Sequence, residues 1–131
     1  KFIFIVLLMI VISIISGCGS DNPSGAITAD LEKDKIKSGE TTKIEFNVQN
    51  TGNSAADAVL IITTENPDKV LIRYDGSLET YLQKDEYVGK IIYVTGYTDI
   101  TSSKYWIKAQ LVNKANNGLL DEEIVYLTVE K

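Results

Sequence analysis

Hydrophobic and polar residues alternate along much of the chain after residue 25, and turn residues interrupt the alternation about every 8 to 15 residues. The segment TTKIEFNVQN, residues 41–50, places Ile44, Phe46 and Val48 on one face and polar side chains on the other. A period of two residues is typical of a β-strand with one buried face. The pattern therefore predicts a mainly β protein whose strands pack around a common core.

Further strands are predicted where apolar runs stand between turn signals. The run AVLIITT at 58–64 is apolar on both faces, which favours a central strand or one covered by a neighbouring subunit. Asn116-Asn117-Gly118 predicts the turn of a hairpin. Helical periodicity is weak after residue 25, although 78–82 can form one helical turn. We expect about seven strands in an immunoglobulin-like β-sandwich, including strands within 70–72, 90–94, 104–113 and 122–131.

The first residues differ from the rest because they are apolar without alternation. Residues 2–17 carry no charge. As a helix this run would be about 24 Å long, which is short for a membrane span of ~20 residues, and it would be apolar all round. We predict an apolar N-terminal α-helix at 1–17, a flexible linker at 18–25 and the β-sandwich at 26–131. The assembly surface of that helix would comprise Phe2, Ile3, Phe4, Ile5, Val6, Leu7, Leu8, Met9, Ile10, Val11, Ile12, Ile14 and Ile15.

A short pattern at the end of the apolar run predicts processing. Ile15-Ser16-Gly17-Cys18 resembles a lipoprotein signal, in which an aliphatic residue and two small residues precede a cysteine. The resemblance implies cleavage before Cys18 and attachment of a lipid to its thiol. Residues 19–25, GSDNPSG, would then form a flexible tether. The product would be a lipid-anchored domain without residues 1–17.

The layout of an apolar helix before a small β domain also resembles archaeal type IV pilins and archaellins. In those families the helices leave the membrane to pack in a filament core, and the β domains face outward. The acidic residue near the mature start of bacterial pilins is absent, since Ile5 stands there, which fits the archaeal branch. The sequence begins at Lys1 without an initiator methionine and includes the apolar run. On these grounds we favour a retained helix and a filament in which each copy binds other copies.

The first half of the β region carries a second resemblance. The segment SGETTKIEFNVQNTGNSAADAVLIITT is similar to immunoglobulin-like modules of archaeal and bacterial surface proteins, in the CARDB group. Gly39 and Glu40 lead into the alternating strand, Asn50 and Gly52 form the turn, and Ala58 is the small residue before the next strand. Such modules are structural or adhesive, so the resemblance implies no catalytic residues.

Charge and composition exclude several functions. The chain has 13 basic and 18 acidic residues, a net charge of −5, and no Lys/Arg run, which argues against nucleic acid as a partner. It has no histidine, and Cys18 is its only cysteine. A zinc site of the Cys/His type, a thiol nucleophile in the folded part and an internal disulfide are therefore excluded. We expect a non-enzymatic protein without a cofactor.

Two clusters remain as candidates for binding. Trp106 lies on the strand face that carries Lys108 and Gln110, so we predict it as an exposed contact to a subunit or ligand such as a sugar. The run Asp121-Glu122-Glu123 could hold calcium, but we favour a solvated strand end and expect no metal site.

The sequence thus predicts an extracellular, cell-surface protein. The favoured function is a pilus-type filament subunit that assembles through the helix at 1–17. The alternative is a lipoprotein anchored at Cys18, whose domain binds an envelope or surface partner.

Overall fold

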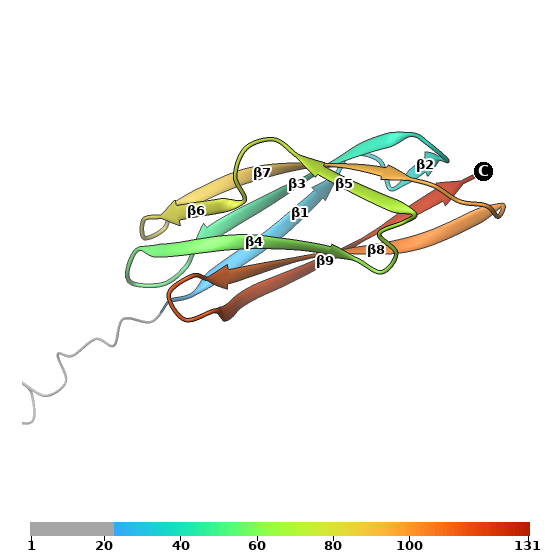
Figure 1. The fold of residues 1–131 in the computed structure, drawn as a ribbon. Helices are drawn as coiled ribbons and strands as arrows, with labels where there is room; N and C mark the ends of the chain where they lie inside the picture. The colour runs from blue at the N-terminus through green and yellow to red at the C-terminus, as the bar shows by residue number, and fades with distance from the viewer. Residues whose placement is uncertain (1–22) are drawn as a thin grey trace, which may run out of the picture.

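The computed structural model describes residues 23–131, which form a two-layered β-sandwich (Figure 1). Sheet A has the strand order β1-β3-β7-β5, and sheet B has the order β2-β9-β8-β4-β6. The prediction of a mainly β sandwich is confirmed. The strands are β1 Gly25–Leu31, β2 Lys35–Lys37, β3 Thr41–Asn50, β4 Ala56–Thr64, β5 Val70–Tyr74, β6 Glu79–Leu82, β7 Tyr87–Gly96, β8 Ser102–Asn113 and β9 Gly118–Glu130.

The core lies between the sheets and is built by the alternation of the long strands. Ile44, Phe46 and Val48 of β3 are fully buried from sheet A, as predicted from their spacing. Ile107 and Leu111 of β8 meet them from sheet B. Burial of each such side chain stabilises the fold by roughly 1.5–3 kcal/mol. The polar residues between them face outward, because successive side chains of a strand point to opposite faces.

The hairpin of β8 and β9 forms where the sequence predicted it. Its turn includes Asn117, which has a φ of 56°, and asparagine tolerates this left-handed conformation better than most residues. A β-bulge interrupts the register after Leu111, which pairs with Asp121, while Val112 pairs with Leu119. The bulge turns Leu120 toward the core and leaves Leu119 exposed.

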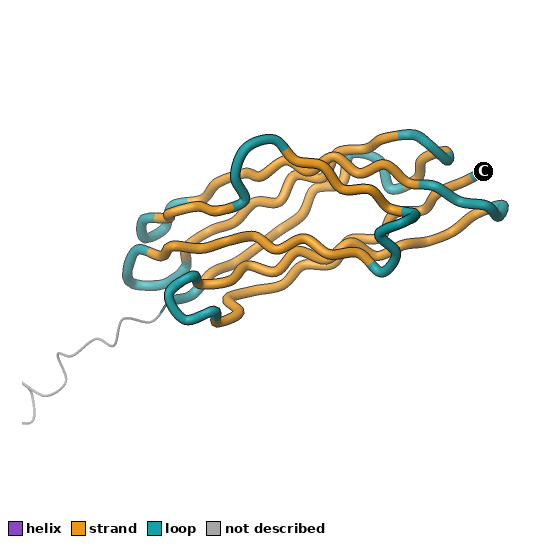
Figure 2. Tube along the Cα trace, viewed as in Figure 1, coloured by secondary structure: helices purple, strands orange, loops and turns teal. Residues whose placement is uncertain are grey.

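The chain changes sheets at both edges of the sandwich. β1 belongs to sheet A, whereas β2 pairs in parallel with β9 in sheet B. β5 belongs to sheet A, and after a bend at Gly76, whose φ is 79°, β6 pairs with β4 in sheet B. Each edge is therefore shared by two short strands. Figure 2 shows most loops at the two ends of the sandwich and the β5–β6 connection crossing along its side.

The two ends of the described chain lie at opposite ends of the sandwich (Figure 1). Near the start, the carbonyl of Ser24 accepts a hydrogen bond from the Thr51 N–H at 3.1 Å, beside the β3–β4 turn. At the C-terminus, the Lys131 N–H donates to the carbonyl of Thr101 at 3.1 Å, in the β7–β8 loop. We call the end with Lys131 the distal end.

The structure differs from the predicted elements in three respects. The described part has nine strands rather than about seven, because β2 and β6 are too short to show alternation. The helical turn predicted at 78–82 is wrong: β6 lies there, and its pairing with β4 buries Leu82. The sandwich begins at Gly25, one residue before the predicted boundary.

The predicted helix at 1–17, and linker residues 18–22 with Cys18, lie outside the described residues. Within 23–131, no helix is long and apolar enough to cross a membrane.

Candidate functional site

Trp106 lies on the outer face of sheet B, where β8 and β9 place it opposite Tyr126. The ring of Trp106 is half-buried and that of Tyr126 is exposed. The ammonium of Lys104 lies 4.8 Å from the centroid of Tyr126, and that of Lys108 lies 5.8 Å from the centroid of Trp106. Both distances are within the range of cation–π attraction. We call these four side chains the aromatic face.

Apolar side chains continue from the aromatic face across sheet B. Ile124 neighbours Lys108 and is 41% exposed, and Ile61 of β4 is 42% exposed opposite Gln110. The Gln110 amide donates a hydrogen bond of 2.9 Å to the Glu122 carboxylate. The face can therefore stack on a planar or apolar group and hydrogen-bond at its rim. Lys104 and Lys108 already occupy the space near the rings, so a ligand would have to displace them.

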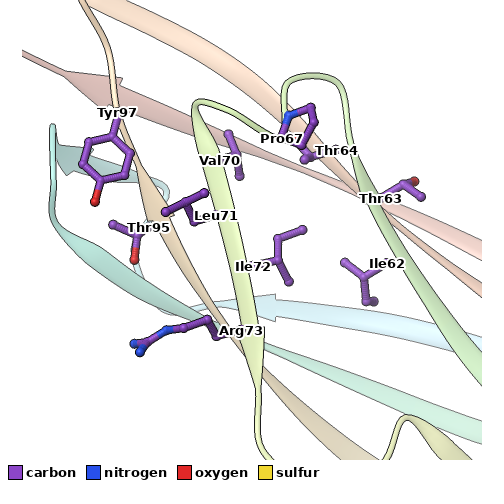
Figure 3. A pocket seen from close by; sticks show the side chains of 10 residues that line it. All are labelled: Ile62, Thr63, Thr64, Pro67, Val70, Leu71, Ile72, Arg73, Thr95 and Tyr97. Atoms are coloured by element: carbon purple, nitrogen blue, oxygen red, sulfur yellow. The ribbon is translucent and has the colours of Figure 1, made fainter.

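A second candidate is the groove between the edges of the two sheets, at β4 and β5. It has a volume of about 840 Å³, and Figure 3 shows Ile72 of β5 pointing toward Ile62 of β4 across it. Leu71 and Arg73 point to the other side of β5 (Figure 3). We call this the edge groove; its lining consists of Ile62, Thr63, Thr64, Pro67, Val70, Leu71, Ile72, Arg73, Thr95 and Tyr97.

The edge groove exists because β6 covers only half of β4. β6 pairs with the segment from Ala56 to Val59, and the Leu60 N–H donates to the carbonyl of Leu78 at 3.0 Å. The rest of β4 has a pairing partner on the β8 side alone. β5 likewise pairs only with β7. Two strand edges therefore border one apolar opening near the distal end.

The hydrogen bonds of β5 alternate between its two sides. The carbonyl of Lys69 accepts a bond of 2.8 Å from Tyr97, beyond the end of β7. The Val70 N–H donates in the opposite direction, to the carbonyl of Asn66 at 2.9 Å. By the antiparallel alternation, Leu71 and Arg73 bond to β7, whereas the N–H and C=O of Ile72 point away from the sheet.

The opposite edge of sheet A is closed by an acidic side chain. The Ile27 N–H of β1 donates a hydrogen bond of 2.9 Å to the Asp121 carboxylate of β9. Asp121 thus satisfies a backbone group of an edge strand, while Glu122 bonds to Gln110 on the outer face. The described residues contain no group of three or more His, Cys, Asp or Glu side chains that could hold a metal ion.

The ion pairs of the described surface stabilise charged forms. Hydrogen bonds from the Lys33 ammonium and the Lys37 N–H lower the pKa of the Glu40 carboxyl. The Asp99 carboxylate raises the pKa of the Lys69 ammonium through a direct hydrogen bond. Both shifts move the pKa of the group further from neutral pH. Acid–base catalysis instead needs a group whose pKa is brought toward the working pH.

The residues of the CARDB-like segment serve the fold. Gly39 adopts a φ of 88°, and Glu40 caps the Lys37 N–H at 3.0 Å. The buried Asn50 amide donates to two carbonyls, and its oxygen accepts the Gly52 N–H at 2.9 Å. These positions build turns and their caps, so the pattern specifies the fold rather than a ligand site. The edge groove had no sequence signal of its own, since its sides come from two separate strands.

Comparison with known proteins bears on the fold alone. No family model matches the chain, and no curated protein matches it. A solved FixG-related protein from Vibrio parahaemolyticus is 12% identical, with a TM-score of 0.58, covering 79% of this chain and 94% of that one. Part of Escherichia coli alpha-2-macroglobulin is 14% identical, with a TM-score of 0.64, covering 82% of this chain and 17% of that one.

The CARDB domain of a Pyrococcus furiosus protein, solved with di-metal ions, is also similar. It is 16% identical, with a TM-score of 0.58, covering 82% of this chain and 88% of that domain. The prediction of an immunoglobulin-like sandwich related in fold to CARDB modules is thereby confirmed. The metal belongs to that other protein.

Proposed function

We propose that this chain is a non-enzymatic cell-surface protein, held at the membrane by its N-terminal segment and presenting its immunoglobulin-like domain outward. The observation that carries the proposal is the completeness of the sandwich. Residues 23–131 bury one continuous core of their own, formed by both sheets. The apolar run at 2–15 is therefore available for a role outside this core.

The positions of the two chain ends, at opposite ends of the domain, support such a presentation. The tether would enter at Gly25, and the C-terminus lies at the distal end (Figure 1). The β4–β5 turn with Pro67 and the exposed Ile100 of the β7–β8 loop then face away from the membrane. The edge groove opens beside Pro67 and Tyr97, so it would be accessible to an envelope or surface partner.

For the anchor we propose a lipid on Cys18. Residues 15–25 support this anchor. Ile15-Ser16-Gly17 provides the small residues that a signal peptidase needs before a cysteine, and Cys18 is the only cysteine in the chain. Glycine at 17 and 19 and proline at 23 oppose continuation of a helix into the domain. A tether of this composition suits a lipid-anchored domain.

The second candidate is the filament subunit, in which residues 1–17 are retained as a helix. Its support is the all-round apolar character of residues 2–15, because such a helix is buried in a membrane or a bundle. The thirteen large apolar side chains between Phe2 and Ile15 would contribute on the order of 20 kcal/mol before ordering costs. The helices would form the filament core, and the sandwiches its outer wall.

Intact mass of the native protein separates the two forms, since the mature chains differ by seventeen residues and a lipid. Under the lipid-anchor proposal, Cys18→Ser releases the protein or leaves it unprocessed, and electron microscopy shows no filaments. Under the filament proposal, Cys18→Ser is neutral and Leu8→Asp abolishes assembly, because a charge is buried without a partner. Total exported protein is measured in parallel, since Leu8→Asp also weakens an export signal. An unprocessed, unlipidated chain that forms no filament would contradict both.

A further inference from the structure

We propose that the domain pairs with a second copy of itself through β5, joining the two copies of sheet A into one continuous antiparallel sheet. The proposal concerns the described domain and does not depend on which anchor residues 1–22 provide. It rests on three features of the β5 edge: unpaired backbone groups, exposed apolar side chains and a self-complementary arrangement of charge.

The backbone of β5 is ready to pair on its outer side. Ile72 directs its N–H and C=O away from β7, as derived above from the bonds of Lys69 and Val70. In an antiparallel pair centred on Ile72, the two Ile72 residues exchange reciprocal hydrogen bonds. The N–H of Tyr74 then donates to the C=O of Val70 in the other copy. The Val70 N–H stays with Asn66, so the pairing breaks no backbone hydrogen bond of the single domain.

The other exposed edges of sheet A are protected, which distinguishes β5 from them. The Asp121 carboxylate bonds to the edge of β1. Beside the unpaired half of β7, the ammonium of Lys90 donates to the carbonyls of Ser77 and Glu79 at 3.0 and 3.2 Å. Such side chains block the addition of another strand. Among the described residues, no side chain bonds to the outward groups of Ile72.

The side chains of β5 favour burial against another strand. Leu71 is 46% exposed and Tyr74 is 48% exposed, although both belong to a strand of an apolar core. Ile72 and Ile62 border the edge groove, and pairing centred on Ile72 would bring the two Ile72 side chains side by side there. The strand is short, so the interface is small and the dimer is weak in solution. Attachment of both copies to one surface would raise their effective concentration.

Charge selects one register among those that the backbone allows. Pairing centred on Ile72 places Lys69 of each copy, whose ammonium also bonds to Asp99 of its own chain, opposite Asp75 of the other. It also places Leu71 beside the aliphatic stem of Arg73. Shifting the centre to Arg73 would bring the two Arg73 residues face to face. Shifting it to Leu71 would place Lys69 opposite Arg73. Both shifts oppose like charges, so the register centred on Ile72 is the favoured one.

The test is a charge-swap experiment by sedimentation, between about 20 µM and about 1 mM. It compares the full chain in detergent micelles with residues 23–131, whose folding is first verified by circular dichroism. Wild type is expected to shift from monomer to dimer over this range. Asp75→Lys and Lys69→Asp, each alone, should weaken the dimer about tenfold, because both cross-strand pairs become repulsive. Lys69→Asp also loses the ion pair with Asp99, so the fold of each variant is first verified by circular dichroism.

Mixing the two variants provides the decisive result. In the mixed dimer each Lys meets an Asp again, so the mixture should dimerise within about threefold of wild type. Asp30→Lys, on the opposite edge strand of sheet A, makes the same charge change and should leave the dimer unaltered. Wild type that stays monomeric throughout, or a mixture no better than its components, would overturn the proposal.

Amide hydrogen exchange supplies an independent readout at single residues. The amides of Leu71 and Arg73 bond to β7 and should exchange slowly at every protein concentration. The amides of Ile72 and Tyr74 should exchange quickly in the monomer and become protected as the concentration rises. Dimerisation without protection at Ile72 and Tyr74 would place the interface elsewhere and refute pairing through β5.

Discussion

Replacement of Asn50 by alanine should destabilise the domain more than its small change in volume implies. Asn50 is 1% exposed at the end of β3. Its side-chain amide donates to the carbonyls of Ser54 at 2.8 Å and Leu82 at 3.1 Å, and its oxygen accepts the N–H of Gly52 at 2.9 Å. One side chain therefore links the β3–β4 turn to the end of β6.

The magnitude follows from the groups that Asn50→Ala would leave without partners. A buried donor or acceptor that loses its partner costs about 1–3 kcal/mol. The N–H of the buried Gly52 loses its acceptor, and two carbonyls lose a donor but retain a second lone pair. We expect a total of about 3–4 kcal/mol. This is a large part of the roughly 5–15 kcal/mol that stabilises a typical domain.

The assay is urea unfolding of wild type and variants, followed by circular dichroism. Asn47→Ala is the matched control, because Asn47 is half-buried on the outer face of the same strand, and we expect a change within about 0.5 kcal/mol. A loss below about 1 kcal/mol for Asn50→Ala, or equal losses at both positions, would refute the reasoning.

Asn50→Asp adds a pH dependence of known sign. The introduced carboxylate accepts the Gly52 N–H but faces two carbonyl oxygens, which raises its folded pKa above the unfolded value. Its protonated form can donate to one of them. The relative stability of the variant should therefore be highest below the unfolded pKa, about 3.9, and fall as pH rises through the folded pKa. A variant equally destabilised at pH 4 and pH 7 would contradict this.

Three other predictions test separate parts of the structure. Gly96→Ala should destabilise by about 1–3 kcal/mol in urea unfolding, because the added methyl overlaps the buried side chain of Val129; unchanged stability would contradict that packing. Glu40→Gln should lower the thermal midpoint at pH 7, where the lowered pKa of Glu40 beside Lys33 stabilises the fold, and the difference should vanish as pH falls through that folded pKa. Chelators should leave the midpoint unchanged, and a drop with EDTA that calcium reverses would show that 121–123 bind metal.

The long strands could be predicted because alternation between neighbouring residues is enough to identify them. Alternation alone identified the buried faces of β3 and β8, and Asn117 marked the turn between β8 and β9. The strand β6, with the sequence ETYL, has no local signal of comparable strength. Its conformation comes from pairing with β4 and from burial of Leu82, which depend on residues distant in the sequence. Tertiary pairing therefore overrode the weak helical preference at 78–82.

In the candidate sites too, features set by neighbouring residues could be predicted, and features set by pairing between distant strands could not. Trp106 could be assigned to an outward face from its position in β8, whereas its approach to Tyr126 required the register with β9. Asp121 was predicted as a solvated acidic residue, but its carboxylate bonds to the Ile27 N–H of β1, far away in the chain. No local pattern contains this contact, because the two residues are 94 positions apart in the sequence.

The contrast between the two edges of sheet A explains why copies of the domain would pair through β5 and not through β1. A net charge of −5 makes copies of the chain repel one another at most orientations. Along residues 68–75, however, the two cations Lys69 and Arg73 balance the two anions Asp68 and Asp75, so this edge carries no net charge. The β1 edge carries the blocking carboxylate of Asp121, and β5 carries none. Copies confined to one surface would therefore meet productively through β5, whereas free copies at low concentration would remain apart.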